Sequence, residues 1–149
     1  METILNKRSG LQLSAKIREI IMDIAVYLFI MLFMYTAASK LLTIKSFAST
    51  LAKSPLIGSL NFIVAWAIPI IEIIISVVLI FPAGRKTGMY ASLLLMAIFT
   101  LYLVYMVFSG TELPCHCGGV ISTMTWQQHI WFNLGFIAVA ITGLSTQKK

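Results

Sequence analysis

Both cysteines of the chain, Cys115 and Cys117, lie two positions apart in a short polar stretch between two long apolar segments. Cysteines used only for packing would not be expected to fall so close together, so the pair indicates a chemical site. A disulfide between them would close a small, strained ring, and strained, exposed disulfides exchange readily with thiols. His116 lies between the two sulfurs and could stabilise a reactive thiolate or move a proton. The sequence therefore predicts thiol–disulfide exchange, with these three residues in catalytic roles.

Two other interpretations of the cysteine pair stay open. The pair could be a static clip or an unused pair of thiols, although inert cysteines normally lie among apolar neighbours. Together with His116 and His129, the two sulfurs could also hold Cu(I) or Zn, because these metals accept thiolate and imidazole ligands. Ligands this close in sequence rarely surround one ion without help from further thiols, and the chain has none. We therefore expect no resident metal.

The composition is that of an integral membrane protein. Hydrophobic residues make up 59% of the chain and charged residues only 11%, against roughly a quarter charged residues in soluble domains. Four segments are long and apolar enough to cross a hydrocarbon layer about 30 Å thick. Because helices satisfy their own backbone hydrogen bonds in lipid, we expect an all-α fold, a bundle of four transmembrane helices in one domain.

The predicted boundaries divide the chain into two short tails and one domain. The tails are residues 1–16 and 145–149, and the domain is 17–144, with helices at about 17–38, 62–81, 87–108 and 126–144. Between the first two helices, apolar residues and lysines alternate with helical spacing over residues 40–58. This pattern predicts an amphipathic helix lying in the membrane interface, with its lysines reaching towards water. An ordinary connecting loop is the alternative.

The basic residues predict the orientation of the bundle. The formal net charge is +6, but the basic residues flank apolar segments rather than forming a patch with aromatics, so we expect no nucleic-acid partner. Four spans place Lys7, Arg8, Lys16, Arg18, Arg85, Lys86, Lys148 and Lys149 on one side, and only Lys40, Lys45 and Lys53 on the other. The positive-inside rule then puts both termini in the cytoplasm and the cysteine loop outside. In a bacterial inner membrane the loop faces the periplasm, where disulfides persist.

Glu72 is the only carboxylate deep inside an expected span. An ionisable residue there is costly, and by default it indicates function. Glu72 would act as a neutral acid that relays protons, or it would be a structural residue hydrogen-bonded between helices. Lys40 is its nearest cationic partner in the expected topology. With Tyr102, Tyr105 and His129, Lys40 would line an internal cofactor site.

Four motifs follow one another along the chain and together resemble a known family. They are Ser39–Leu41 at the end of the first helix, Ile68–Glu72 in the second, Pro114–Gly119 in the loop, and Trp126, His129 and Asn133 at the start of the fourth. The resemblance is to the DoxX-like superfamily and, through the cysteine loop, to its MauE branch of redox-associated membrane proteins. It covers the chain from about Ile20 to Leu144.

The resemblance implies a role in disulfide chemistry. MauE is associated with the maturation of methylamine dehydrogenase, by supporting periplasmic disulfide formation, and DoxX-like relatives are linked to quinone and thiol oxidation. It assigns the reactive pair to Cys115 and Cys117 and the membrane carboxylate to Glu72. It does not transfer the substrate, since nothing in this chain points to methylamine.

These observations lead to one functional prediction and one rival. We expect a thiol–disulfide redox protein that exchanges electrons with a periplasmic thioredoxin-like or thiol substrate protein. A membrane quinone is the expected electron carrier, since the chain has no dinucleotide fingerprint. The rival is a non-catalytic subunit or assembly factor of a partner complex in the membrane.

Overall fold

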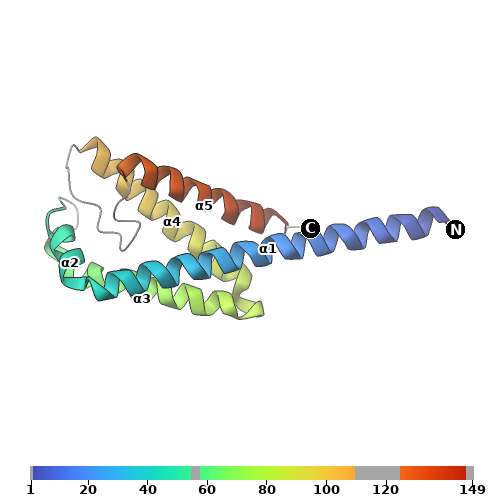
Figure 1. The fold of residues 1–149 in the computed structure, drawn as a ribbon, viewed down its shortest axis with the longest axis horizontal. Helices are drawn as coiled ribbons and strands as arrows, with labels where there is room; N and C mark the ends of the chain where they lie inside the picture. The colour runs from blue at the N-terminus through green and yellow to red at the C-terminus, as the bar shows by residue number, and fades with distance from the viewer. Residues whose placement is uncertain (1, 55–57, 110–124, 147–149) are drawn as a thin grey trace.

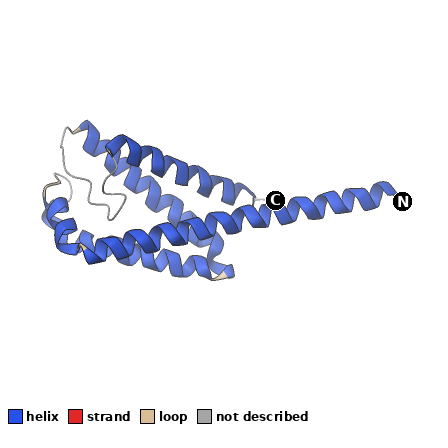
Figure 2. Cartoon of the chain, in the orientation of Figure 1, coloured by secondary structure: helices blue, strands red, loops and turns tan. Residues whose placement is uncertain are grey.

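The computed structural model describes residues 2–54, 58–109 and 125–146 (Figure 1). Every regular element within these ranges is helical (Figure 2). The chain forms α1 (Glu2–Leu42), α2 (Ile44–Ala52), the 3-10 turn η1 (Gly58–Leu60), α3 (Asn61–Ile80), the 3-10 turn η2 (Pro82–Gly84), α4 (Arg85–Phe108) and α5 (Trp126–Thr146). The predicted reactive residues Cys115, His116 and Cys117 lie outside the described residues. The all-α prediction is confirmed for the part of the chain that is described.

The four long helices pack in a ring. α1 lies between α3 and α5, and α4 completes the ring by packing against the same two helices. The short helix α2 lies at one end of this bundle, where α4 ends and α5 begins (Figure 1). We call this the outer end, and we call the opposite end, where α4 begins, the inner end.

Three of the described helical segments are long and apolar enough to cross a membrane: Ala15–Leu42, Gly58–Ile80 and Pro82–Phe108. They correspond to the first three predicted spans. α5 has 21 residues, roughly 31 Å at helical rise, but its first two turns contain Gln127, Gln128, His129 and Asn133. These polar side chains make α5 less apolar than its neighbours, and the fourth crossing stays a prediction.

α1 begins at Glu2, whereas the sequence analysis placed the start of the first helix at about residue 17. Residues 2–16 contain no proline and mostly residues that are compatible with a helix, so nothing in their local chemistry ends the helix. As a result, α1 extends well beyond the other helices on the side of its N-terminus (Figure 1).

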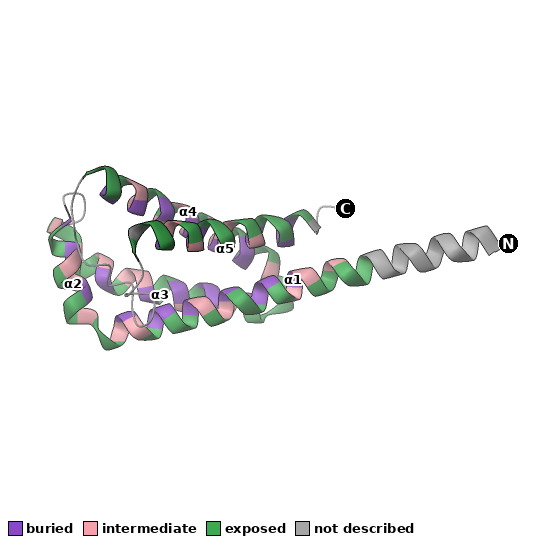
Figure 3. Cartoon of the chain, turned by 45° about the horizontal axis from the view of Figure 1, so that its top comes forward, coloured by how far each residue is buried: buried purple, intermediate pink, exposed green. Residues whose placement is uncertain are grey.

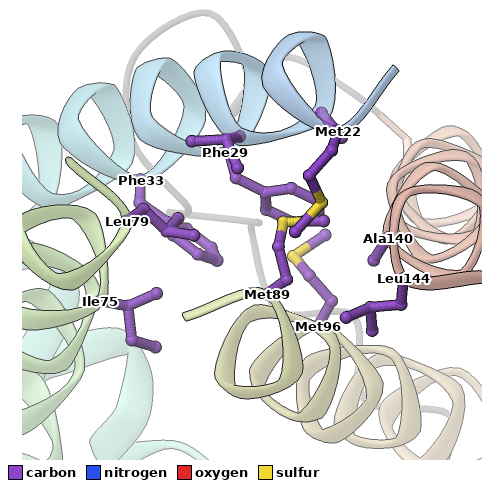
Figure 4. Close-up of a cluster of buried hydrophobic side chains, with 11 residues drawn as sticks. Met22, Phe29, Phe33, Ile75, Leu79, Met89, Met96, Ala140 and Leu144 are labelled. Carbon is purple, nitrogen blue, oxygen red and sulfur yellow. The ribbon is translucent and has the colours of Figure 1, made fainter. Parts of the chain in front are cut away.

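The main hydrophobic core fills the inner part of the bundle (Figure 4). All four long helices contribute to it: Met22, Ala25, Val26, Phe29 and Phe33 from α1, Ile75 and Leu79 from α3, Met89 and Met96 from α4, and Ala140 and Leu144 from α5. We call this set the inner core. α3 and α4 approach closely at Gly88, where an added Cβ would lie 2.7 Å from Leu79 Cδ2. A glycine at this position therefore lets the two helices make contact.

α2 packs on the outer turns of α3 through a second, smaller cluster. Phe47 and Leu51 of α2 are buried against Ala65 of α3, while Lys45 and Lys53 are exposed. The predicted amphipathic segment is therefore helical over Ile44–Ala52. Its position in the membrane interface stays a prediction.

Candidate functional site

A buried ion pair joins α1 to α3. The ammonium of Lys40 donates a hydrogen bond to Glu72 Oε1. Both residues are removed from solvent, with exposed fractions of 4% for Lys40 and 1% for Glu72. Because an unpaired charge in such surroundings is very costly, each residue makes the burial of the other tolerable. The structure thus brings together the carboxylate and the lysine that the sequence analysis singled out.

The position of Lys40 near the end of its helix explains how the pair forms. Lys40 lies two residues before the end of α1, and Glu72 lies near the middle of α3. A long, flexible lysine side chain can reach from the helix end towards the middle of a bundle while its methylene groups stay in apolar surroundings. Its ammonium also lies 5.1 Å from the ring centroid of Phe99 on α4, a distance at which the face of an aromatic ring attracts a cation. The charge of Lys40 therefore interacts with two helices besides its own.

Other polar side chains are buried in the same part of the bundle. Thr36 lies one turn before Lys40 on α1, Thr100 follows Phe99 on α4, and His129 and Asn133 occupy the first two turns of α5. All four are buried, His129 at 6% and Asn133 at 4% exposure. With Lys40 and Glu72 they form a set that we call the polar layer.

Buried residues recur along all four long helices (Figure 3). The polar layer and the inner core are two different sets of these buried residues. Along α1, the buried residues nearer the inner end are apolar (Met22, Ala25, Val26, Phe29 and Phe33), and those nearer the outer end are Thr36, Ala37 and Lys40. Along α5, His129 and Asn133 are buried nearer the outer end, and Ala140 and Leu144 nearer the inner end. The polar layer thus extends from the outer end to about the middle of the bundle. Residues 110–124, which contain both cysteines, connect α4 to α5 at this same end.

The remaining predicted site residues differ in their surroundings. Tyr102 is partly buried on α4, whereas Tyr105, one turn further along, is 40% exposed. Tyr105 therefore lies away from the buried face that carries Thr100. The cofactor-binding roles given to Lys40, Tyr102, Tyr105 and His129 stay predictions.

The sequence analysis assigned no role to three residues of the polar layer. Asn133 lies one turn after His129, and Thr36 lies one turn before Lys40. This i, i+4 spacing puts each of them on the same helix face as a residue already singled out, which is the signal that could have identified them. Thr100 has no such neighbour, and its hydroxyl donates to the carbonyl of Met96 at 2.7 Å. Only the packing of α4 reveals that Thr100 is buried.

A second ion pair lies at the inner end of the bundle. Arg85 Nη1, at the start of α4, donates to Asp23 Oδ1 of α1 at 2.5 Å. Both side chains are about one third exposed, so this pair is less desolvated than Lys40–Glu72. It provides an internal comparison for the buried pair.

Comparison with known proteins gives one match. The family model for the methylamine utilisation protein MauE matches residues 18–146, a region that includes the bundle, the polar layer and the segment with both cysteines. This match confirms the resemblance to MauE found in the sequence motifs. No curated protein and no solved structure matches the chain.

Proposed function

Because the chain belongs to the MauE family of membrane proteins, we propose that it is a membrane-embedded thiol–disulfide redox protein whose reactive pair is Cys115 and Cys117. The observation that carries this proposal is where the cysteine segment is attached. It joins α4 to α5 at the outer end, the end towards which the buried polar residues of α1 and α5 lie. A redox-active pair needs proton donors and acceptors near it, and this end of the bundle supplies them.

The exchange itself follows ordinary thiol–disulfide chemistry. A thiolate of the partner protein attacks one sulfur of the Cys115–Cys117 disulfide, forming a mixed disulfide and releasing the other sulfur as a thiolate. A second partner thiol then attacks its own mixed-disulfide sulfur, which leaves the partner oxidised and the Cys115–Cys117 pair as a dithiol. Two electrons pass from the partner to the pair. The same steps in reverse oxidise the pair and reduce the partner.

A membrane quinone would complete the cycle. Oxidation of the Cys115–Cys117 dithiol releases two electrons and two protons, and reduction of a quinone to a quinol takes up the same number of each. Residues of the polar layer, Lys40 and Glu72 above all, would donate and accept the protons of this reaction. His116 would assist the thiolate within the loop.

The proposed topology places the cysteine segment in an oxidising compartment. Four helices would cross the bacterial inner membrane, α5 being the fourth, with α2 in the outer interface and both termini in the cytoplasm. The distribution of Lys and Arg supports this orientation, since eight of the 11 basic residues would lie on the side of the inner end. The cysteine segment would then meet a periplasmic thioredoxin-like or thiol substrate protein.

Thiol trapping in intact cells tests the proposal. The variants Cys115→Ser and Cys117→Ser each retain one thiol, and one of them should accumulate a mixed disulfide with the partner because the resolving sulfur is missing. The double variant is the matched control, since it should reach the membrane in the same amount and form no adduct. The redox state of the wild-type pair should change when a reductant is added to the cells.

A different outcome would favour the rival function. If neither single-cysteine variant forms an adduct and the wild-type pair does not respond to reductant, the redox proposal is wrong. The chain would then be a non-catalytic subunit or assembly factor in the membrane, a role that is compatible with membership of the same family.

A further inference from the structure

We propose that one part of the outer end is a hinged cap, which tilts about Thr43 and Pro69 and is held in place by the Lys40–Glu72 ion pair. The cap consists of α2, η1 and the outer turns of α3, and its described residues are 44–54 and 58–68. This inference goes beyond the proposed function. It concerns the motion of described helices and does not depend on exchange at the cysteines.

The cap has a hydrophobic cluster of its own. Phe47 and Leu51 of α2 are buried against Ala65 of α3, and these three residues are separate from the inner core. A hydrogen bond adds to this packing, since Asn61 Nδ2 on α3 donates to the carbonyl of Ala48 on α2 at 3.3 Å. α2 and the outer turns of α3 are therefore fastened to each other and can move as one unit.

The first connection between the cap and the bundle is a break in the helix at Thr43. α1 ends at Leu42 and α2 begins at Ile44. Thr43 has φ −112° and ψ 28°, which lie outside the α-helical region, and α2 leaves the axis of α1 at this point (Figure 1). Because a single residue joins the two helices, a change in its backbone torsions tilts α2 relative to α1.

The second connection is the turn of α3 that contains Pro69. Proline has no N–H group, so Pro69 cannot donate a hydrogen bond to the carbonyl of Ala65, four residues earlier. A helix that lacks one of its backbone hydrogen bonds bends more readily at that turn than elsewhere. Pro69 follows directly after the last residue of the cap, and it is the point at which α3 can bend.

The buried ion pair lies next to both hinges. Lys40 precedes Thr43 by three residues, and Glu72 follows Pro69 by three residues. The hydrogen bond from Lys40 to Glu72 therefore ties α1 to α3 within one turn of the points at which these helices enter the cap. A tie at this place fixes the spacing of the two hinges, and with it the position of the cap.

The cap covers Glu72 along α3. From Glu72 towards the outer end, the buried residues of α3 are Pro69 and Ala65, and Phe47 and Leu51 of α2 lie against Ala65. The inner core, on the other side of Glu72, holds side chains from all four long helices in contact. Regions with fewer buried contacts open at a lower free energy. We therefore expect motion in the cap, and its tilting would uncover Glu72 along α3.

Distances between nitroxide spin labels, measured by pulsed electron paramagnetic resonance on the full chain in lipid nanodiscs, test this motion. The Cys115→Ser/Cys117→Ser background removes the native thiols, so the labels attach only to introduced cysteines. Ser49→Cys on α2 and Phe62→Cys on the outer part of α3 report on the cap. Each is paired with Lys86→Cys at the start of α4, and all three positions are exposed.

The control pair is Tyr105→Cys with Lys86→Cys. Both positions are on α4, roughly 28 Å apart at helical rise, so this pair spans one helix without a hinge. Both cap pairs should give distance distributions at least about twice as wide as that of the control pair, because hinge motion adds to the spread of the labels themselves. Equal widths would show that the cap is rigid and the proposal wrong.

Two further variants test the hinge and the tie. Pro69→Ala supplies the missing N–H group and should narrow the distributions of both cap pairs. Lys40→Met/Glu72→Leu removes the tie without leaving a buried charge and should widen both. Asp23→Asn, which removes the carboxylate of the exposed ion pair, is the matched control and should change neither.

The outcomes separate the alternatives. No effect of Pro69→Ala, or widening of the Ser49 pair without the Phe62 pair, would mean that α2 detaches alone and that α3 does not bend. No effect of the Lys40→Met/Glu72→Leu variant would mean that the ion pair does not hold the cap. Since the background contains no native cysteine, this measurement and thiol trapping succeed or fail independently.

Discussion

Lys40 and Glu72 form their ion pair between α1 and α3 with almost no exposed surface, whereas Asp23 and Arg85 form theirs between α1 and α4 at the bundle's edge. The two pairs share helix α1 and the same charge types but differ in desolvation. The effect of removing one partner of an ion pair on stability depends on how far the pair is desolvated. Water screens the attraction within an exposed pair, and it stabilises the remaining charge when one partner is removed.

Removing one partner of the buried pair should destabilise the protein strongly. We expect Lys40→Met alone to lower the free energy of unfolding by about 3–5 kcal/mol, because it removes the cation that pairs with the buried Glu72 carboxylate. The double variant Lys40→Met/Glu72→Leu should recover most of this loss. Unfolding of the purified protein in mixed micelles measures the difference.

The matched control is the exposed pair. Asp23→Leu and Arg85→Met should show a coupling energy below about 1 kcal/mol in the same double-mutant cycle. A coupling as large as that of Lys40 and Glu72 would show that burial is not what distinguishes the two pairs.

The ring of Phe99 should stabilise the Lys40 charge. We expect Phe99→Leu, which keeps an apolar side chain but removes the aromatic face, to cost about 0.5–2 kcal/mol. The same substitution in the Lys40→Met background should cost less, since no cation remains above the ring. Equal costs in the two backgrounds would mean that Phe99 acts only through packing.

Gly88 should be the least replaceable of the glycines whose surroundings are described within the long helices, which are Gly88, Gly135 and Gly143. Gly88→Ala would bring a methyl group to 2.7 Å from Leu79 Cδ2, so we expect a loss of about 1–3 kcal/mol from overpacking between α3 and α4. Gly135→Ala on α5 is the matched control, because an added Cβ there meets nothing within 4 Å. Its effect should be neutral or stabilising by up to about 1 kcal/mol through helix propensity. Thermal unfolding of both variants in the same detergent gives the comparison.

The orientation of the bundle can be read from two exposed lysines at opposite ends. In the Cys115→Ser/Cys117→Ser background, Lys45→Cys on α2 should react with a membrane-impermeant maleimide in intact spheroplasts. Lys86→Cys at the start of α4 should react only after the membrane is permeabilised. The reverse pattern would place the cysteine segment in the cytoplasm and remove the basis for a disulfide site there.

Much of the fold could be predicted from local sequence, because membrane helices are specified by length and apolar composition. The ends of α3 and α4 lie within two residues of the predicted ones, since Pro82 and Gly84 interrupt the apolar run between them. The start of α1 was not predictable in this way, because the end of an apolar segment is not the end of a helix. Polar residues 2–16 continue α1 without a break.

The sequence by itself determined which residues could do chemistry, because two cysteines, one deep carboxylate and one lysine at a helix end stand out in so apolar a chain. Only the tertiary structure decided which of them meet. Glu72 lies on a helix that is apolar nearly all round, so periodicity does not tell which face is buried, and 32 residues separate it from Lys40. The contact exists because α1 and α3 pack side by side, and the division into a polar layer and an inner core exists because four helices place their buried faces together. Such a relationship depends on residues distant in sequence, and local patterns carry no information about it.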